Sequence, residues 1–127
     1  MEITINEVIK KTQGNSIIKF ATKYGSAYGL WNGTEPQINK EYIVEVDIPA
    51  VLCWQIDIIS AQEEYFITIE NNKFCLTGLF ESIDDDGYLV IRLGESIVSV
   101  ETQGNPLDLG SFVKLSTDTL VLYEVNY

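Results

Sequence analysis

The sequence predicts an all-β protein made of two tandem, five-stranded small barrels that pack as one body. Apolar residues alternate with polar ones over short segments bounded by turn residues, and no stretch has the period of a long helix. The segments 41–58 and 110–127 share one pattern, two alternating apolar runs around a short polar break. This repeated pattern, in a chain of 127 residues, indicates two similar units.

The first half reads as strands joined by turns. Strands are predicted over 2–11, with a possible bulge near Val8, over 17–23 and over 27–31. Turns at 13–16 and 24–26 separate them, and the loop 32–36 contains Asn-Gly and a proline. The segment 41–58 then predicts a β-hairpin with one buried face.

The second half repeats this order after a short linker. Residues 60–64 lack β character, and an extra strand over 65–70 turns at Asn71-Asn72 into a strand over 73–83. Asp84 to Gly87 form a hairpin turn, because Asp-Gly is a strong two-residue turn signal. Strands over 88–93 and 96–101 follow, and the segment 110–127 predicts a second hairpin.

The start of each unit aligns at an offset of 71 residues, which places Ile3 on Phe74 and Ile5 on Leu76. The predicted organisation is a first barrel over 1–59, a linker with an extra strand over 60–72, and a second barrel over 73–127. Five short strands with an early long hairpin suit an SH3-like or OB-like barrel. Whether the halves form separate barrels or one merged sheet system stays open, because periodicity does not specify pairing.

The charge of the chain is strongly one-sided. There are 19 acidic and 8 basic residues, so the net charge is −11. Such a field repels nucleic acid phosphates and anionic lipid, and it favours a basic protein partner. The acids outnumber the bases more strongly in residues 65–127, where there are ten acids and three bases, than in residues 1–64, where there are nine acids and five bases. The second unit is therefore the predicted partner-binding half.

The cysteine and histidine content narrows the functional classes. Cys53 and Cys75 lie in apolar runs, which predicts free thiols rather than a disulfide scaffold. The chain has no apolar run of membrane-spanning length and no signal-peptide pattern at its start, so we expect a cytoplasmic protein without a membrane partner. Histidine is absent, which removes histidine-based nucleophilic systems and most zinc sites. We predict no catalytic residue, metal or cofactor.

Two other functions remain open alternatives, beside a purely structural subunit of a larger assembly. A carboxylate-based enzyme would use Glu45, Asp47 and Asp57, because residues two apart in a strand share a face. A nucleic-acid-binding barrel would stack bases on aromatic side chains beside lysines, although the acidity opposes it. Its candidate residues are Lys19, Lys23, Tyr24, Tyr28 and Trp31.

In size, acidity and lack of histidine the chain resembles the immunity proteins of bacterial toxin–immunity pairs. That resemblance, which is one of general character, implies a stoichiometric binder that blocks a basic toxin or nuclease with carboxylates around an aromatic anchor. Charge places the predicted contact surface on the second unit. Its residues are Asp84, Asp85, Asp86, Tyr88, Glu95, Glu101 and Asp108.

Overall fold

The structure is a computed structural model that describes residues 1–12 and 15–125. The described residues contain twelve β-strands and no helix. The strands are β1 (Glu2–Thr12), β2 (Asn15–Thr22), β3 (Gly25–Asn32), β4 (Glu41–Asp47), β5 (Leu52–Cys53), β6 (Ile58–Ser60), β7 (Phe66–Glu70), β8 (Lys73–Ile83), β9 (Tyr88–Leu93), β10 (Ser96–Gln103), β11 (Phe112–Thr117) and β12 (Val121–Glu124). The predicted all-β class is confirmed. Of the predicted turn at 13–16, Gln13 and Gly14 lie outside the described residues.

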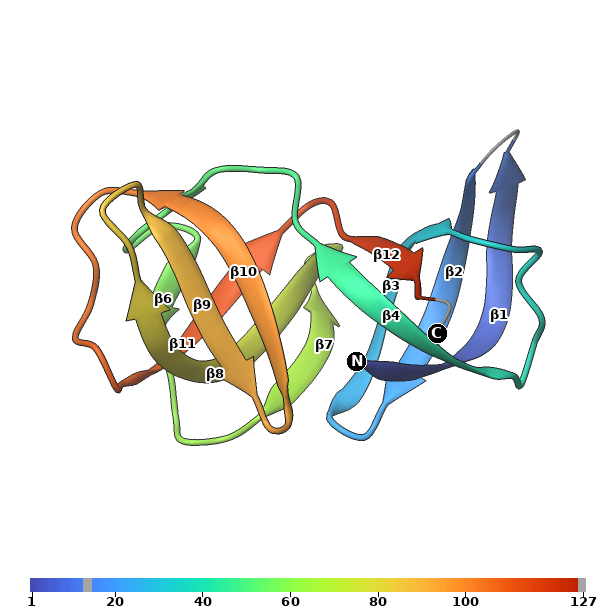
Figure 1. The fold of residues 1–127 in the computed structure, drawn as a ribbon, viewed down its shortest axis with the longest axis horizontal. Coiled ribbons are helices and arrows are strands. Elements are labelled where there is room, and N and C mark those ends of the chain that lie inside the picture. The colour runs from blue at the N-terminus through green and yellow to red at the C-terminus, as the bar shows by residue number, and fades with distance from the viewer. Residues whose placement is uncertain (13–14, 126–127) are drawn as a thin grey trace.

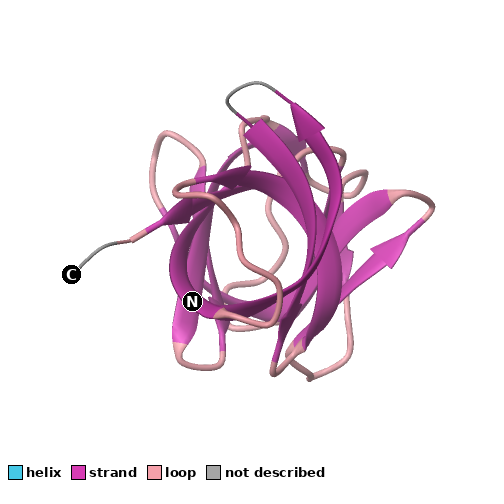
Figure 2. Cartoon of the chain, turned by 90° about the vertical axis from the view of Figure 1, so that its right-hand side faces the viewer, coloured by secondary structure: helices cyan, strands magenta, loops and turns pink. Residues whose placement is uncertain are grey.

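The strands form two five-stranded barrels side by side (Figure 1). In the first barrel the order is β12-β4-β1-β2-β3, and β12 closes the ring by pairing in parallel with β3. Figure 2 looks into this barrel and shows the strands as a ring. The second barrel runs β10-β9-β8-β11, and its fifth position is shared by β5, which pairs with β10, and β6, which pairs with β11; a bridge between Trp54 and Ile58 joins these two short strands. Both are SH3-like small barrels, as predicted, and β7 is the extra strand on β8.

Each barrel takes its fifth strand from the other half of the sequence. β4 pairs with β12, whereas β5 and β6, which follow β4 in the chain, pair with β10 and β11 of the second barrel. The hairpins predicted for 41–58 and 110–127 are therefore wrong in their pairing, although their strands exist. The strand pairing also crosses the sequence boundary predicted near residue 59.

The connections explain why no hairpin forms. Several tight turns of the structure contain a residue with positive φ, among them Gly25, Asn71, Asn72 and Gly94. The connector between β4 and β5 (residues 48–51) and the one between β11 and β12 (residues 118–120) contain none. Neither connector therefore makes the tight turn with positive φ that the other hairpins use, and each crosses to the neighbouring barrel instead.

The predicted offset of 71 between the first strands of the two units is also wrong. β1 has a register shift after Ile5, which pairs with Phe20, and β8 has one after Phe80, which pairs with Ile91. Ile5 and Phe80 are 75 residues apart, while Phe20 and Ile91 are 71 apart. The two offsets, 75 and 71, differ by four residues. Because four is an even number, both offsets match buried positions of β1 with buried positions of β8. Alternation alone therefore does not distinguish 71 from 75.

The exchanged strands carry large core residues into the partner barrel. Trp54, which follows β5, is 3% exposed, and its ring lies 5.1 Å from that of Phe80 in the second barrel. Its indole N–H donates to the Thr102 hydroxyl at 3.0 Å. In the first barrel Leu122 of β12 is fully buried. The buried residues of both barrels belong to one continuous apolar cluster, so the two barrels form one body.

A carboxylate holds the end of β12 in place. Glu124 Oε1 accepts hydrogen bonds from the Thr34 amide at 2.8 Å and from the Thr34 hydroxyl at 2.7 Å. Gly33 allows this approach, because a Cβ at that position would lie 2.7 Å from the Cβ of Glu124. The hydrogen bonds from Thr34 hold the pKa of Glu124 below its usual value.

Replacing Leu122 with alanine should destabilise both barrels together. Removing a fully buried leucine side chain costs about 2–5 kcal/mol. Urea unfolding is followed by fluorescence with either Trp31 or Trp54 kept as the sole tryptophan, and Leu122→Ala should lower the midpoint of each reporter by a similar amount relative to its own single-tryptophan parent. Leu109→Ala is the control, because Leu109 is 66% exposed. A shift seen only by Trp31 would show that the barrels unfold independently.

The Glu124 contact should make stability depend on acid pH. Because its folded-state pKa is lowered, its contribution is complete above the unfolded pKa of about 4.3 and is lost as the pH falls through the folded pKa. Urea midpoints of Glu124→Gln should therefore lie below wild type at pH 7 and converge with it at the acid end of the titration. A difference that stays constant with pH would contradict this role.

Candidate functional site

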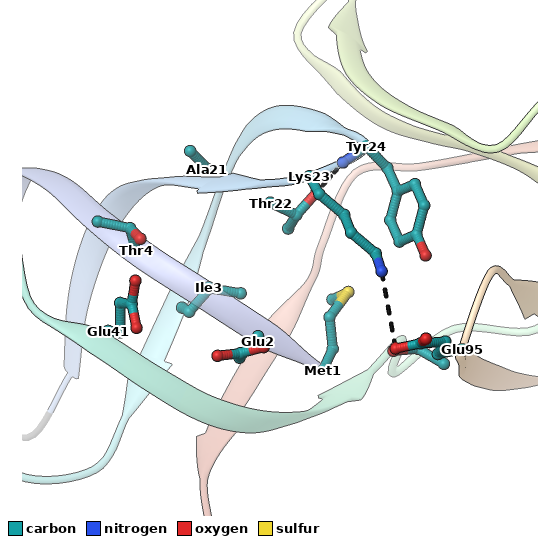
Figure 3. A pocket seen from close by; sticks show the side chains of 11 residues that line it. Met1, Glu2, Ile3, Thr4, Ala21, Thr22, Lys23, Tyr24, Glu41 and Glu95 are labelled. Carbon is teal, nitrogen blue, oxygen red and sulfur yellow. Dashed lines mark hydrogen bonds and ion pairs between the residues drawn. The ribbon is translucent and has the colours of Figure 1, made fainter.

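Two grooves lie along one side of β10, between the barrels. We call the first the Tyr88 groove. It has a volume of about 440 Å³ and is lined by residues 47–51 of the first connector and by Tyr88, Ser99, Val100 and Glu101. The second, the Lys23 groove, has a volume of about 290 Å³ and is lined by residues 1–4, 21–24, Glu41, Glu95 and Ser96 (Figure 3). Ser96 begins β10 and Glu101 lies near its end, so the two grooves follow the same strand.

Carboxylates dominate the lining of both grooves. Asp47 and Glu101 line the Tyr88 groove, and Glu2, Glu41 and Glu95 line the Lys23 groove. Among these lining side chains the basic one is that of Lys23, which lies 3.6 Å from the Glu95 carboxylate. A hydrogen bond with Tyr24 and the charge of Glu95 raise the pKa of Lys23. The cleft therefore carries an excess of negative charge.

Tyr88 stands at the rim of its groove. Its side chain is 48% exposed, and across the sheet it is paired with Glu101. The preceding Gly87 has φ +86°, and a Cβ there would lie 2.3 Å from the Thr102 carbonyl oxygen. The tight turn therefore packs directly on β10 and fixes the place where Tyr88 begins β9. Exposed tyrosines are enriched in protein interfaces.

The turn at 84–86 adds charge beside the groove. Asp84, Asp85 and Asp86 are all exposed. The Asp84 carboxylate accepts the backbone N–H groups of Asp86 and Tyr88, each at 2.9 Å, so it also shapes the turn. Asp85 and Asp86 extend the acidic surface next to Tyr88.

The other predicted contact residues are spread more widely. Glu95 lies in the turn between β9 and β10, at the opposite end of these strands from Tyr88, and it lines the Lys23 groove. Asp108 lies in the loop between β10 and β11, on the side of the second barrel away from the first (Figure 1). The structure thus brings Tyr88, Glu101 and the turn 84–86 together, places Glu95 along the same strand, and leaves Asp108 apart.

The carboxylates considered for catalysis are not assembled into one site. Asp47 lines the Tyr88 groove. Glu45 is exposed on β4 and is paired with Tyr123 of β12. Asp57 lies in the turn between β5 and β6, where its carboxylate accepts the Cys53 amide at 2.8 Å. Glu45 and Asp47 share one face of β4, as their spacing predicts, but Asp57 lies in the other barrel because β5 and β6 are exchanged.

The aromatic platform considered for nucleic acid is also not formed. Trp31 is 2% exposed, packs against Tyr42 with ring centres 4.8 Å apart, and donates its indole N–H to Thr34. Tyr24 packs edge-on against Tyr65 at the junction of the barrels. Tyr28, next to Lys19 on the paired strand, is 41% exposed, so one aromatic residue and not three is available for stacking.

Sequence reasoning missed Glu2 and Glu41 as members of an acidic cleft, and it placed Asp47 in a different kind of site. These residues belong to the first half, and they meet β10 only because the connector after β4 crosses to the second barrel. The absence of glycine and asparagine from residues 48–51 was the available signal, because these residues favour the positive φ of tight hairpin turns.

Tyr24 also holds the barrels at their present separation. Its hydroxyl sits against Gly94, which has φ +61°, and a Cβ on Gly94 would lie 1.7 Å from that oxygen. The Tyr24 carbonyl accepts the Ile67 amide at 3.0 Å. The turn of the first barrel is therefore fitted into the turn of the second at the floor of the cleft.

Gly94→Ala should destabilise the protein more than Gly110→Ala does. Both glycines have positive φ, which costs a non-glycine residue about 1–3 kcal/mol. Only Gly94 has an atom in the way, since nothing lies within 4 Å of a Cβ on Gly110. The melting temperatures of the two variants are compared with that of the wild type. The decrease for Gly110→Ala reports the backbone cost alone, and the additional decrease for Gly94→Ala reports the clash with Tyr24. Equal melting temperatures would show that Tyr24 moves aside freely.

Comparison with known proteins gives one partial likeness. Residues 66–102 match the family model described as the biotin protein ligase C-terminal domain. The matched segment, less than half of the chain, runs from β7 nearly to the end of β10 and agrees with the SH3-like fold of the second barrel. No curated protein and no solved structure matches the chain.

Residues 1–12 and 15–125 contain neither a metal-binding cluster nor a membrane-spanning helix. No group of three or more Cys, Asp or Glu side chains is placed to hold a metal ion. No helix is long and apolar enough to cross a membrane. Both cysteines are free thiols, with Cys75 buried and Cys53 partly exposed.

Proposed function

We propose that this protein is an acidic protein-binding module of the immunity or inhibitor kind, and that it covers the basic active site or substrate groove of a toxin or nuclease in the cytoplasm. The observation that supports this most directly is the cleft between the barrels, where five carboxylates and one exposed tyrosine line two neighbouring grooves and outnumber the two positive groups, Lys23 and the Met1 ammonium.

Electrostatics favours a basic protein over other partners. A net charge of −11 steers a positively charged partner toward the molecule and raises the association rate. The same field opposes nucleic acid and anionic membranes. Tyr88 supplies a rigid, amphipathic side chain of the kind that is enriched among interface hot spots. Asp47 and Glu101 line the same groove and can form ion pairs with lysine or arginine side chains of the partner.

The free thiols support the cytoplasmic assignment, because reducing compartments keep cysteines unpaired. The family match supports the SH3-like fold of the second barrel, and its segment 66–102 does not include Glu2, Glu41 and Asp47 of the cleft.

The proposal predicts capture of one basic protein by way of the cleft. Immobilised protein should retain it from source-cell lysate at low salt, release it near half-molar salt, and inhibit its purified activity at a 1:1 ratio. The double variant Asp47→Asn, Glu101→Gln should weaken binding by about 1–3 kcal/mol, because two charge pairs are lost. Association rates measured by surface plasmon resonance should fall as well.

Asp108→Asn is the matched control, since it removes one charge far from the cleft. Equal weakening by Asp108→Asn would mean that only net charge matters. Retention of RNA or DNA, or of a basic protein whose activity is unaffected, would contradict the inhibitor proposal.

A further inference from the structure

One edge of β10 is open beside the Tyr88 groove. β10 pairs with β9 from Ser96 to Glu101, but on its other side it pairs with β5 only at Thr102 and Gln103. The Thr102 amide donates to the Gly87 carbonyl on the β9 side, at 2.8 Å. Backbone groups alternate in direction along a strand, so the amides of Ser99 and Glu101 point to the open side, into the cleft.

The first barrel shows what fills the same place. There β3 is the counterpart of β10, and the Leu30 amide donates to the carbonyl of Leu120 at 2.9 Å. Leu120 is 3% exposed and lies against Gly29, with its carbonyl oxygen and a methyl group each 3.4 Å from where a Cβ would be. An extended segment with an apolar side chain therefore covers the edge of β3 and continues into β12.

The second barrel lacks this covering segment. Val100 stands at the position of Gly29, because Gly29 pairs with Ile18 and Val100 pairs with Leu89 in the equivalent strand pairs. The connector 48–51 is displaced from the strand, its Ala50 amide donates back to Ile48, and the space left is the Tyr88 groove. Within residues 1–12 and 15–125, no backbone acceptor is found for the Glu101 amide.

We propose that an extended segment of the basic partner adds to this open edge of β10 as a further strand, in the place that Leu120 and its neighbours occupy on β3. The inference rests on the proposed function and names how the partner is held. Main-chain hydrogen bonds to Ser99 and Glu101 supply the register, and side chains of the segment reach both walls of the cleft.

The charges select a segment in which lysine or arginine alternates with apolar residues. Successive side chains of a strand point to opposite faces, so apolar side chains lie on the face of the buried Val100, as Leu120 lies against Gly29, while basic ones lie on the face of Ser99 and Glu101 and also reach Asp47. From Ser96 to Glu101 the edge is about 17–20 Å long at ~3.3 Å per residue, and it ends at the Lys23 groove with Glu95. A second copy of the chain is disfavoured by its own charge of −11.

The test uses the full-length protein and a defined probe. The probe is a capped seven-residue peptide in which lysine alternates with valine or leucine, with a glutamate-for-lysine peptide as the charge control. Titration followed by backbone NMR should shift the Ser99 and Glu101 amides saturably and slow the hydrogen exchange of the Glu101 amide. A version of the probe with N-methyl groups on alternate residues, along one edge, should bind about tenfold more weakly.

Two protein variants separate the strand addition from the charge. Ser99→Pro removes an edge donor that faces away from β9, a position where proline is tolerated in sheets, and should weaken the probe about tenfold. Asp47→Asn with Glu101→Gln should weaken it through charge. If Ser99→Pro and N-methylation leave affinity unchanged while the charge variant loses it, strand addition is wrong and the acidic interface stands. If none of the changes matters, both proposals are wrong.

Discussion

The reciprocal exchange of fifth strands is the constraint on which the rest of this structure depends. β12 fills the gap between β3 and β4, and β5 with β6 fills the gap between β10 and β11. A five-stranded barrel of this size has little core of its own, and closure removes the exposed strand edges that would otherwise invite aggregation. Since each closure is supplied from the opposite half, neither barrel is complete without the other, and a single apolar cluster runs through both.

The two crossings are equivalent in topology but not in packing, and the difference creates the cleft. Over Gly29 the second connector lies close enough for Leu120 to be buried, whereas over Val100 the first connector is held away from the strand. The filled edge thus has Gly29 at this position, and the open edge has Val100. The acids Asp47, Glu41 and Glu2 then face β10 because β4 and β1 form the opposite wall.

Many of the strands can be predicted from the alternation of apolar and polar residues and from the turn residues between them. β8 and β9 fall at the predicted residues, and the Asp-Gly turn between them is present, because hairpins with positive-φ residues are local features. The pairing of β4 with β12 was not predicted, since it joins residues such as Val46 and Leu122 that are far apart in sequence. Of the predicted contact residues, Tyr88 and Glu101 meet because β9 and β10 form a local hairpin. Asp47 and Glu41 join them only through the strand exchange.

Strand exchange also bears on the order in which the chain is made. On a ribosome the first four strands emerge early, yet the partner strand for both β3 and β4 is β12, which is synthesised after all of the others. The second barrel differs, because β5 and β6 have already been synthesised when their partner strands β10 and β11 emerge. Closure of a ring by distant segments is entropically slow. The barrel that is begun first is therefore the last to close, and until then its acidic surface is its main protection against self-association.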